Sequence, residues 1–125
     1  MLTSDYQALG GHDGLTVIIT DFVDRVFGDF IIGFFFEGKD RTKLIRREVE
    51  FAAAHLGGPV AYSGRPLGGV HRPLKINQGH FRRRLAILRT VLVEHDVPSD
   101  LIDRWIEHDR RLMALITTGE DCVDG

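Results

Sequence analysis

His71 stands alone between two irregular stretches, and its surroundings suit a metal-ligating imidazole. The glycine-rich break Gly57-Gly58-Pro59 ends the helical pattern before it, and Asn77 is placed to open the next helix. An imidazole on a short segment among apolar side chains can ligate the iron of a flat apolar cofactor from one side. The alternative is a histidine that only fills space. The apolar residues around it in the sequence are Leu67, Val70, Leu74, Ile76 and Phe81.

Three consecutive phenylalanines, Phe34 to Phe36, precede Glu37-Gly38. They cannot all point into one narrow core, so the pattern favours some of them facing a cavity or a ligand. A plain hydrophobic plug between helices is the alternative. With His71 the apolar residues describe a slot that has one nitrogen ligand, and its other members are Phe22, Leu44, Phe51 and Phe81.

Helices must position these side chains, because apolar residues recur at intervals of three and four residues. No strict alternation of apolar and polar residues, as in a strand, appears. We expect one helix capped by Asp13, a second over Thr42–Leu56, a third capped by Asn77 and a fourth opening at Pro98-Ser99-Asp100. The chain is therefore predicted to be all-α. The inward residues expected are Leu15, Ile18, Ile19, Phe22, Val26 and Phe27 in the first helix; Leu44, Phe51, Ala52 and Leu56 in the second; Phe81, Leu85, Leu88 and Leu92 in the third; and Leu101, Ile102, Trp105, Ile106, Leu112, Met113 and Ile116 in the fourth.

The loop-rich section Gly57–Ile76 has no place in a plain four-helix bundle, where connections are short. A bound cofactor could supply the apolar surface on which it packs.

Composition indicates a single domain over residues 1–125, with 1–4 and 117–125 as flexible tails. The net charge of −2 gives no support for binding to nucleic acid or to an anionic membrane. The single cysteine, Cys122, excludes a disulfide within the chain. No secretory signal is visible, and the apolar run Phe30–Phe36 is too short to span a bilayer. We expect a soluble cytoplasmic protein.

Short motifs follow one another in a fixed order along the chain: Leu9-Gly10-Gly11, Asp21-Phe22, Phe35-Phe36-Glu37-Gly38, Glu50-Phe51, Leu56-Gly57-Gly58-Pro59, Tyr62-Ser63-Gly64-Arg65, Val70-His71, Ile76, His80-Phe81 and Val97-Pro98. This ordered series resembles the truncated haemoglobins of group I over roughly Asp5 to Ile116. The resemblance implies a globin-like two-over-two helical sandwich enclosing haem b. It also implies that His71 is the proximal iron ligand and that Phe36 packs against the porphyrin.

The same matching implies that Lys43, Arg47 and Tyr62 contact the haem propionates, since carboxylates at a solvent boundary accept from such donors. A solvated helix face is the alternative for Lys43 and Arg47, and it is the expected state of Arg82-Arg83-Arg84. The residues expected to contact the cofactor are Phe22, Phe35, Phe36, Lys43, Leu44, Arg47, Phe51, Tyr62, Leu67, Val70, His71, Ile76 and Phe81.

The distal pocket implied by the resemblance is Val23, Leu44 and Glu48, and two of the three depart from the family pattern. Val23 stands where the family usually has a tyrosine, and Glu48 where it often has glutamine. Leu44, Glu48, Phe51 and His55 share one helical stripe, which favours an inward Glu48; pairing with an arginine at the haem edge is the alternative. Valine donates no hydrogen bond, so oxygen should be held weakly unless burial keeps Glu48 protonated.

The leading functional hypothesis is a haem protein with an open distal site that binds O₂, NO or CO, with nitric oxide dioxygenase chemistry that yields nitrate. Sustained turnover would need a separate reductase. The alternatives are gas sensing or storage without turnover, peroxidase-like oxidation through Glu48, and an engineered carbene- or nitrene-transfer catalyst. We expect a monomer or weak dimer. His12, His80, His95 and His108 are expected to be structural or exposed, and His55 lies too far along its helix for a second axial ligand.

Overall fold

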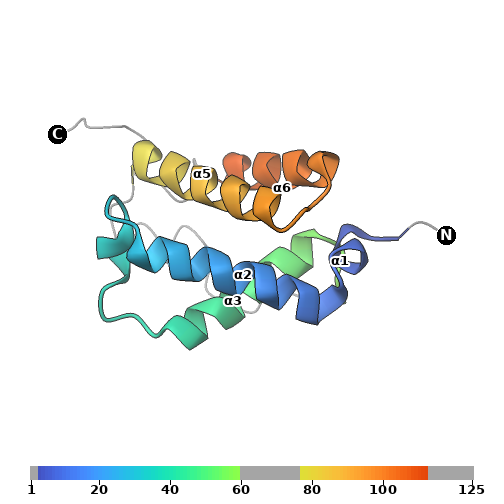
Figure 1. The fold of residues 1–125 in the computed structure, drawn as a ribbon, viewed down its shortest axis with the longest axis horizontal. Coiled ribbons are helices and arrows are strands. Elements are labelled where there is room, and N and C mark those ends of the chain that lie inside the picture. The colour runs from blue at the N-terminus through green and yellow to red at the C-terminus, as the bar shows by residue number, and fades with distance from the viewer. Residues whose placement is uncertain (1–2, 60–76, 113–125) are drawn as a thin grey trace.

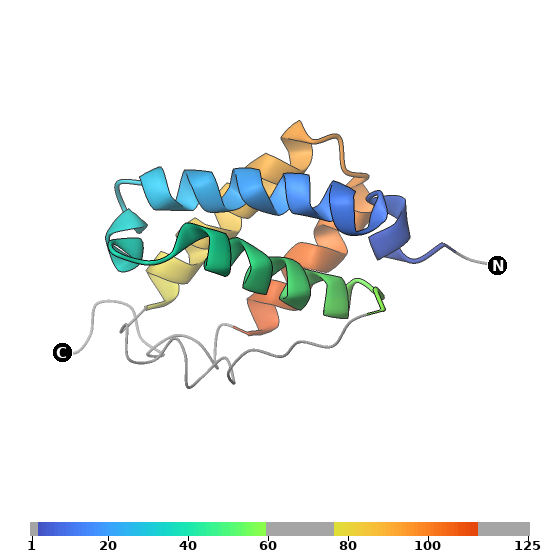
Figure 2. The ribbon, with the colours of Figure 1, turned by 90° about the horizontal axis from the view of Figure 1, so that it is seen from below.

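The computed structural model describes residues 3–59 and 77–112, and every regular element within these ranges is helical. Helices α2 (Gly11–Gly28) and α3 (Arg41–His55) form one layer, and α5 (Gln78–Glu94) and α6 (Ser99–Arg111) form the other. Figure 1 shows the second pair lying over the first, and Figure 2 shows α5 and α6 running obliquely across α2 and α3. The short α1 (Asp5–Ala8) precedes α2, and the 3₁₀ helix η1 (Gly33–Phe36) follows it. The predicted all-α, two-over-two arrangement is confirmed.

The core lies between the two layers and is built from the predicted helical stripes. Nearly all of the inward positions predicted for α2 and α5 are buried, with Phe27 the one that is half-buried. Leu44, Phe51 and Leu112 are also only half-buried, while Met113 and Ile116 lie outside the described residues. In the described ranges, no helix combines the length and the apolar character needed to cross a bilayer. The largest fully buried side chains are Leu15, Ile19, Val23, Leu88, Val91, Leu92 and Leu101.

The start of α5 is the predicted one, and the start of α2 is not. The Asn77 side chain accepts a hydrogen bond from the His80 N–H at 2.8 Å, and the His80 ring closes a reciprocal bond to the Asn77 N–H. In α2 the cap is Gly10, with φ of 96°, and Asp13 lies inside the first turn. The prediction that Asp13 caps this helix was wrong, because a left-handed glycine starts α2 directly after α1.

The chain between α2 and α3 is fixed by Asp29, which holds η1 against α5. Its Oδ2 accepts from the N–H groups of Ile31 and Ile32, at 3.0 Å each. Its Oδ1 accepts from Arg83 of α5, with 2.6 Å between Nη2 and Oδ1. Only 6% of the Asp29 side chain is exposed, so these bonds are largely shielded from water. Asp29 thus positions the phenylalanine corner.

Gly33 lets this corner pack closely on the end of α2. A β-carbon at this position would lie 2.8 Å from the carbonyl oxygen of Phe27, closer than real side chains approach. The close approach lets η1 fold back, so that Phe36 lies against Phe27 with 5.4 Å between ring centroids.

Candidate functional site

Four of the apolar side chains expected to contact the cofactor are only half-buried, and we call them the apolar row. They are Phe35 and Phe36 of η1 with Leu44 and Phe51 of α3. Behind it, Phe22 of α2 is fully packed, with 2% of its surface exposed. Apolar surface left open to water is unfavourable by roughly 25 cal/mol per Å². The row is therefore a surface that an apolar ligand would cover favourably.

The three phenylalanines differ in exposure, although the Phe34 and Phe35 rings lie against each other with 4.1 Å between centroids. Phe34 is 55% exposed, whereas Phe35 and Phe36 are half-buried. Phe35 lies edge-on to the His80 ring of α5, with 5.0 Å between centroids. Packing on both sides fixes the orientation of Phe35 and Phe36 at the rim.

Arg84 of α5 lies at the centre of a polar group enclosed by the helices. Its Nη2 donates to Glu48 Oε1 at 3.0 Å, and its Nη1 donates to Asp109 Oδ2 at 3.1 Å. The guanidinium carbon lies 5.0 Å from the Phe22 ring centroid and 5.7 Å from that of Phe81, within cation–π range. One cation thus ties α3, α5 and α6 together beside two aromatic rings.

The sequence-based expectation of a solvated face for the arginine run was wrong for Arg84. Arg82 is exposed, and Arg83 pairs with Asp29. Arg84, however, stands three positions after Phe81 and four before Leu88, on the buried stripe of the helix. That spacing was the available signal, and the three-residue charge run obscured it.

The charges of this group shift one another in ways that follow from burial. Burial raises the pKa of Glu48, and the nearby Arg84 offsets only part of that effect. Burial alone would raise the pKa of Asp109 as well, but the hydrogen bond from His108 and the charge of Arg84 outweigh it and lower the pKa. Burial also opposes the charge on Arg84, yet the two carboxylates more than compensate and raise its pKa. The stable form is a charged Arg84–Asp109 pair beside an acid that protonates readily.

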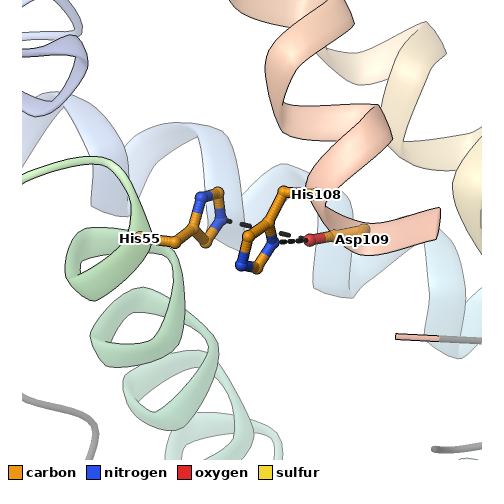
Figure 3. A group of neighbouring side chains, drawn as sticks. All are labelled: His55, His108 and Asp109. Atoms are coloured by element: carbon orange, nitrogen blue, oxygen red, sulfur yellow. Dashed lines mark hydrogen bonds and ion pairs between the residues drawn. The ribbon is translucent and has the colours of Figure 1, made fainter. Parts of the chain in front are cut away.

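The polar group continues to two histidines on the far side of Asp109 (Figure 3). His108 Nδ1 donates to Asp109 Oδ1 at 2.9 Å, and the His55 ring stacks on His108 with centroids 3.8 Å apart. Sequence reasoning treated His108 as structural or exposed and did not single out Asp109. Asp109 follows Ile102 and Trp105 on the buried stripe of α6, so its inward position was readable from spacing.

Some of the remaining predicted site residues are described by the structure, and others lie outside the described ranges. Val23 is buried, with 1% of its surface exposed, and Leu44 is half-buried. Arg47 is half-buried and Lys43 is exposed, which puts Lys43 at the solvent edge of α3. The residues that lie outside the described ranges are Tyr62, Leu67, Val70, His71 and Ile76.

Comparison with known proteins identifies the architecture. Residues 4–117 match the family described as bacterial-like globin. The group 1 truncated haemoglobin of Mycolicibacterium paratuberculosis is 36% identical over 117 residues, which cover 94% of this chain and 86% of that protein.

Solved structures agree on the fold. The truncated haemoglobin of Tetrahymena pyriformis in its Fe(III) form superposes with a TM-score of 0.86 at 22% identity, covering 92% of this chain and 98% of that one. The 2/2 haemoglobin of Synechococcus, in the cyanomet state with covalently attached haem, gives a TM-score of 0.81 at 24% identity, covering 90% and 99%. The helical sandwich, the family match and the sequence identity agree, and this chain therefore belongs to the bacterial-like globins, in the group 1 truncated haemoglobin branch.

Proposed function

We propose that this protein binds haem b, with His71 as the protein ligand to iron, and takes up O₂, NO or CO on the opposite side. The observation that carries the proposal is the half-buried apolar row, together with the Arg84–Glu48 pair, since Glu48 shares one face of α3 with Leu44 and Phe51. Family membership implies haem-based gas binding, and the assignment of His71 rests on the sequence resemblance. When bound, the haem supplies an iron centre that coordinates diatomic gases and exchanges electrons.

The described residues fit such a group. A porphyrin is flat and apolar on its faces, and the open rim of Phe35, Phe36 and Leu44 offers apolar surface for it. At the solvent edge of α3, Lys43 and Arg47 carry positive charge, which suits propionate groups. We extend the propionate assignment to Tyr62 on the resemblance alone.

On the gas-binding side the chain offers three candidate residues with different abilities. Val23 contributes only shape, because its side chain neither donates nor accepts. Glu48 can donate only when protonated, a form that its raised pKa favours. Arg84 donates to both Glu48 and Asp109, and further guanidinium N–H groups stay available for a bound ligand. A polar ligand would therefore be held through Glu48 and Arg84 and not through position 23.

Within this function we favour conversion of nitric oxide and dioxygen to nitrate over storage or sensing alone. The enclosed Arg84–Glu48 pair supports this choice, because positive charge and a donor favour ligands that become anionic. Turnover would draw electrons from a separate reductase.

The test is an absorption spectrum of the purified protein with and without CO. We expect a Soret band that shifts on addition of CO to the reduced protein, and loss of most haem in His71→Ala. His12→Ala, which changes an exposed histidine, should keep both properties. A His71→Ala protein with full haem content and an unchanged CO spectrum would overturn the ligand assignment.

Peroxidase-like oxidation is a second candidate, and the Glu48–Arg84 contact is what favours it. A carboxyl group beside a guanidinium can take up and return a proton while the cation binds developing negative charge. A positioned acid–base group contributes roughly 10²- to 10⁴-fold to rate. Glu48→Leu should then lower peroxide-dependent dye oxidation at least tenfold at equal haem content. An unchanged rate would remove this candidate and leave gas binding in place.

A further inference from the structure

Two histidines and one aspartate from different helices meet at one point that the proposed haem function does not use. His55 is the last residue of α3, and His108 and Asp109 lie in the final turns of α6. Figure 3 shows both rings next to the carboxylate. His108 Nδ1 lies 2.9 Å and His55 Nε2 lies 4.0 Å from Asp109 Oδ1, and all three ligand atoms fall within 4.8 Å of one another.

One of these atoms lacks a partner. His55 Nε2 is buried and makes no hydrogen bond within the described residues. Only 11% of the His55 side chain is exposed. A buried polar nitrogen without a partner costs on the order of 1–3 kcal/mol, so such atoms are uncommon in native structures. The unpaired nitrogen faces the shared carboxylate, and an ion between them would satisfy it.

The spacing suits a small metal ion. Zinc binds imidazole nitrogen and carboxylate oxygen at about 2.0–2.2 Å, so tetrahedral ligand atoms are about 3.4 Å apart. The measured separations of 2.9 Å and 4.0 Å lie on either side of that value. The two rings are stacked with their planes 13° apart, so an ion can reach both nitrogens only after an imidazole rotates. Because Phe51 and Trp105 pack on the His55 ring, this rotation would fall on the more exposed His108.

Metal ligands must be deprotonated, and one of these atoms has to change for the ion to bind. His108 Nδ1 now donates to Asp109 Oδ1 at 2.9 Å, so an ion would take the place of this hydrogen bond and the His108 proton would move to Nε2.

The surroundings hold the ligands in place and balance part of the charge. Arg84 binds Asp109 Oδ2 at 3.1 Å and leaves Oδ1 for the ion, as outer-shell partners of metal ligands do. Glu48 pairs with the same arginine, so Arg84 is shared between two acidic side chains. Phe51 and Trp105 pack against the His55 ring at 5.8 Å and 5.7 Å, which restricts its rotation.

The ligand set selects the class of metal. Two imidazoles and a carboxylate suit Zn²⁺ and similar first-row ions, whereas Ca²⁺ and Mg²⁺ prefer oxygen ligands only. His108 is 34% exposed, which gives an ion access from solvent and leaves room for water as a fourth ligand.

We propose that His55, His108 and Asp109 form a Zn²⁺ site that joins the end of α3 to the end of α6. None of its three ligands is assigned to haem, although Arg84, which holds Asp109, also belongs to the proposed gas-binding pocket.

Calorimetric titration of ZnCl₂ into the chelator-treated full-length protein, with whatever haem it carries, tests the site. We expect one equivalent of Zn²⁺, with binding at least tenfold weaker in His55→Ala, His108→Ala and Asp109→Asn. His12→Ala is the matched control, because it removes an exposed histidine elsewhere, and its affinity should equal that of the wild type. Affinity unchanged in both His55→Ala and His108→Ala would overturn the proposal.

A second measurement guards against misfolded variants. Crystals of the wild-type protein soaked in ZnCl₂ should give an anomalous peak at the zinc edge between His55, His108 and Asp109. The absence of a peak there overturns the site, whatever the variants do.

Discussion

Arg84 shows how one side chain can decide the character of a site. Asp109 is 3% exposed, and Arg84 and His108 are its hydrogen-bond donors in the described structure. A buried carboxylate without a cation is very unfavourable, because its desolvation is not repaid. Glu48 depends on the same guanidinium. Loss of Arg84 would therefore leave two acids uncompensated at once.

We expect Arg84→Met to destabilise the protein by roughly 3 kcal/mol. This is at the low end for breaking a buried ion pair, since 22% of the Arg84 side chain stays exposed. Arg89→Met is the control, because Arg89 pairs with Asp103 at 3.7 Å with both side chains about half or more exposed. Exposed pairs contribute about 0–1 kcal/mol. Urea unfolding at neutral pH measures both, and equal midpoints for the two variants would contradict the role given to Arg84.

A residue-level prediction for gas binding follows from Val23 and Glu48. A hydrogen bond to a partly charged ligand is worth roughly 1.5–3 kcal/mol. Because we place Glu48 and Arg84 at the bound gas, Val23→Tyr should change O₂ release less than tenfold. A slowing of tenfold or more, at about 1.4 kcal/mol per decade and with little effect on CO, would show that no donor reaches the gas in the wild type.

Glu48 and Arg84 are the rival donors, since they already contact each other. If they hold the ligand, Val23→Tyr changes little and Glu48→Leu speeds O₂ release instead. Stopped-flow measurement on both single variants separates the cases. Rates equal to the wild type in both would mean that neither residue faces the ligand.

At the scale of elements, the sequence pattern predicted the helices well because apolar residues recur at helical spacing over several turns of each helix. The stripe Phe81, Leu85, Leu88 and Leu92 and the Asn77 cap were both readable, since each depends on local spacing. The start of α2 was not, because a glycine with positive φ competes with an ordinary aspartate cap at Asp13. The inward positions of Arg84 and Asp109 were readable from spacing, but their pairing was not. A buried charge needs a partner, and here the partners come from distant segments that local pattern does not show.

The turn that carries η1 depends on Asp29, and its stability should depend on pH. The bond from Arg83, with those from the N–H groups of Ile32 and Ile31, lowers the pKa of Asp29. A carboxyl group whose pKa is lower in the folded state stabilises above its unfolded pKa of about 3.9, and this contribution is lost as pH falls below it.

Asp29→Ala should therefore cost about 1–2 kcal/mol at pH 7, from lost hydrogen bonds to a charged acceptor. The difference from wild type should shrink towards pH 3. Asp24→Ala is the matched control, because Asp24 pairs with Arg41 at 2.9 Å with both side chains about half exposed. Chemical denaturation at both pH values provides the measurement. A difference that grows on acidification would contradict the sign of the Asp29 effect.

At the scale of the whole molecule, the two helical layers are joined by an apolar core and by Arg84, which bonds from α5 to α3 and α6. The apolar row of Phe35, Phe36, Leu44 and Phe51 stays half-buried. A ligand bound there stabilises only the folded state, because the row exists only when η1 and α3 are in place. Haem binding and folding should thus be linked.

The last prediction is that removal of haem lowers the melting temperature by at least about 10 °C. A ligand that binds only the folded state adds RT ln(1 + [L]/Kd), which is about 4 kcal/mol at a thousand times Kd. For a domain of this size, 1 kcal/mol corresponds to roughly 3–5 °C. Differential scanning calorimetry of the holo- and apoproteins provides the measurement, and haem added back to the apoprotein should restore the transition in proportion to haem bound. Leu44→Ala should reduce the gain from haem, whereas Val17→Ala, at a 60% exposed position on the surface of α2, should leave it unchanged. Identical melting temperatures for the two forms would mean that haem does not bind the folded state preferentially. A Leu44→Ala protein that keeps the full gain from haem would mean that the apolar row is not where haem binds, because surface buried by a ligand contributes to the stability of the complex.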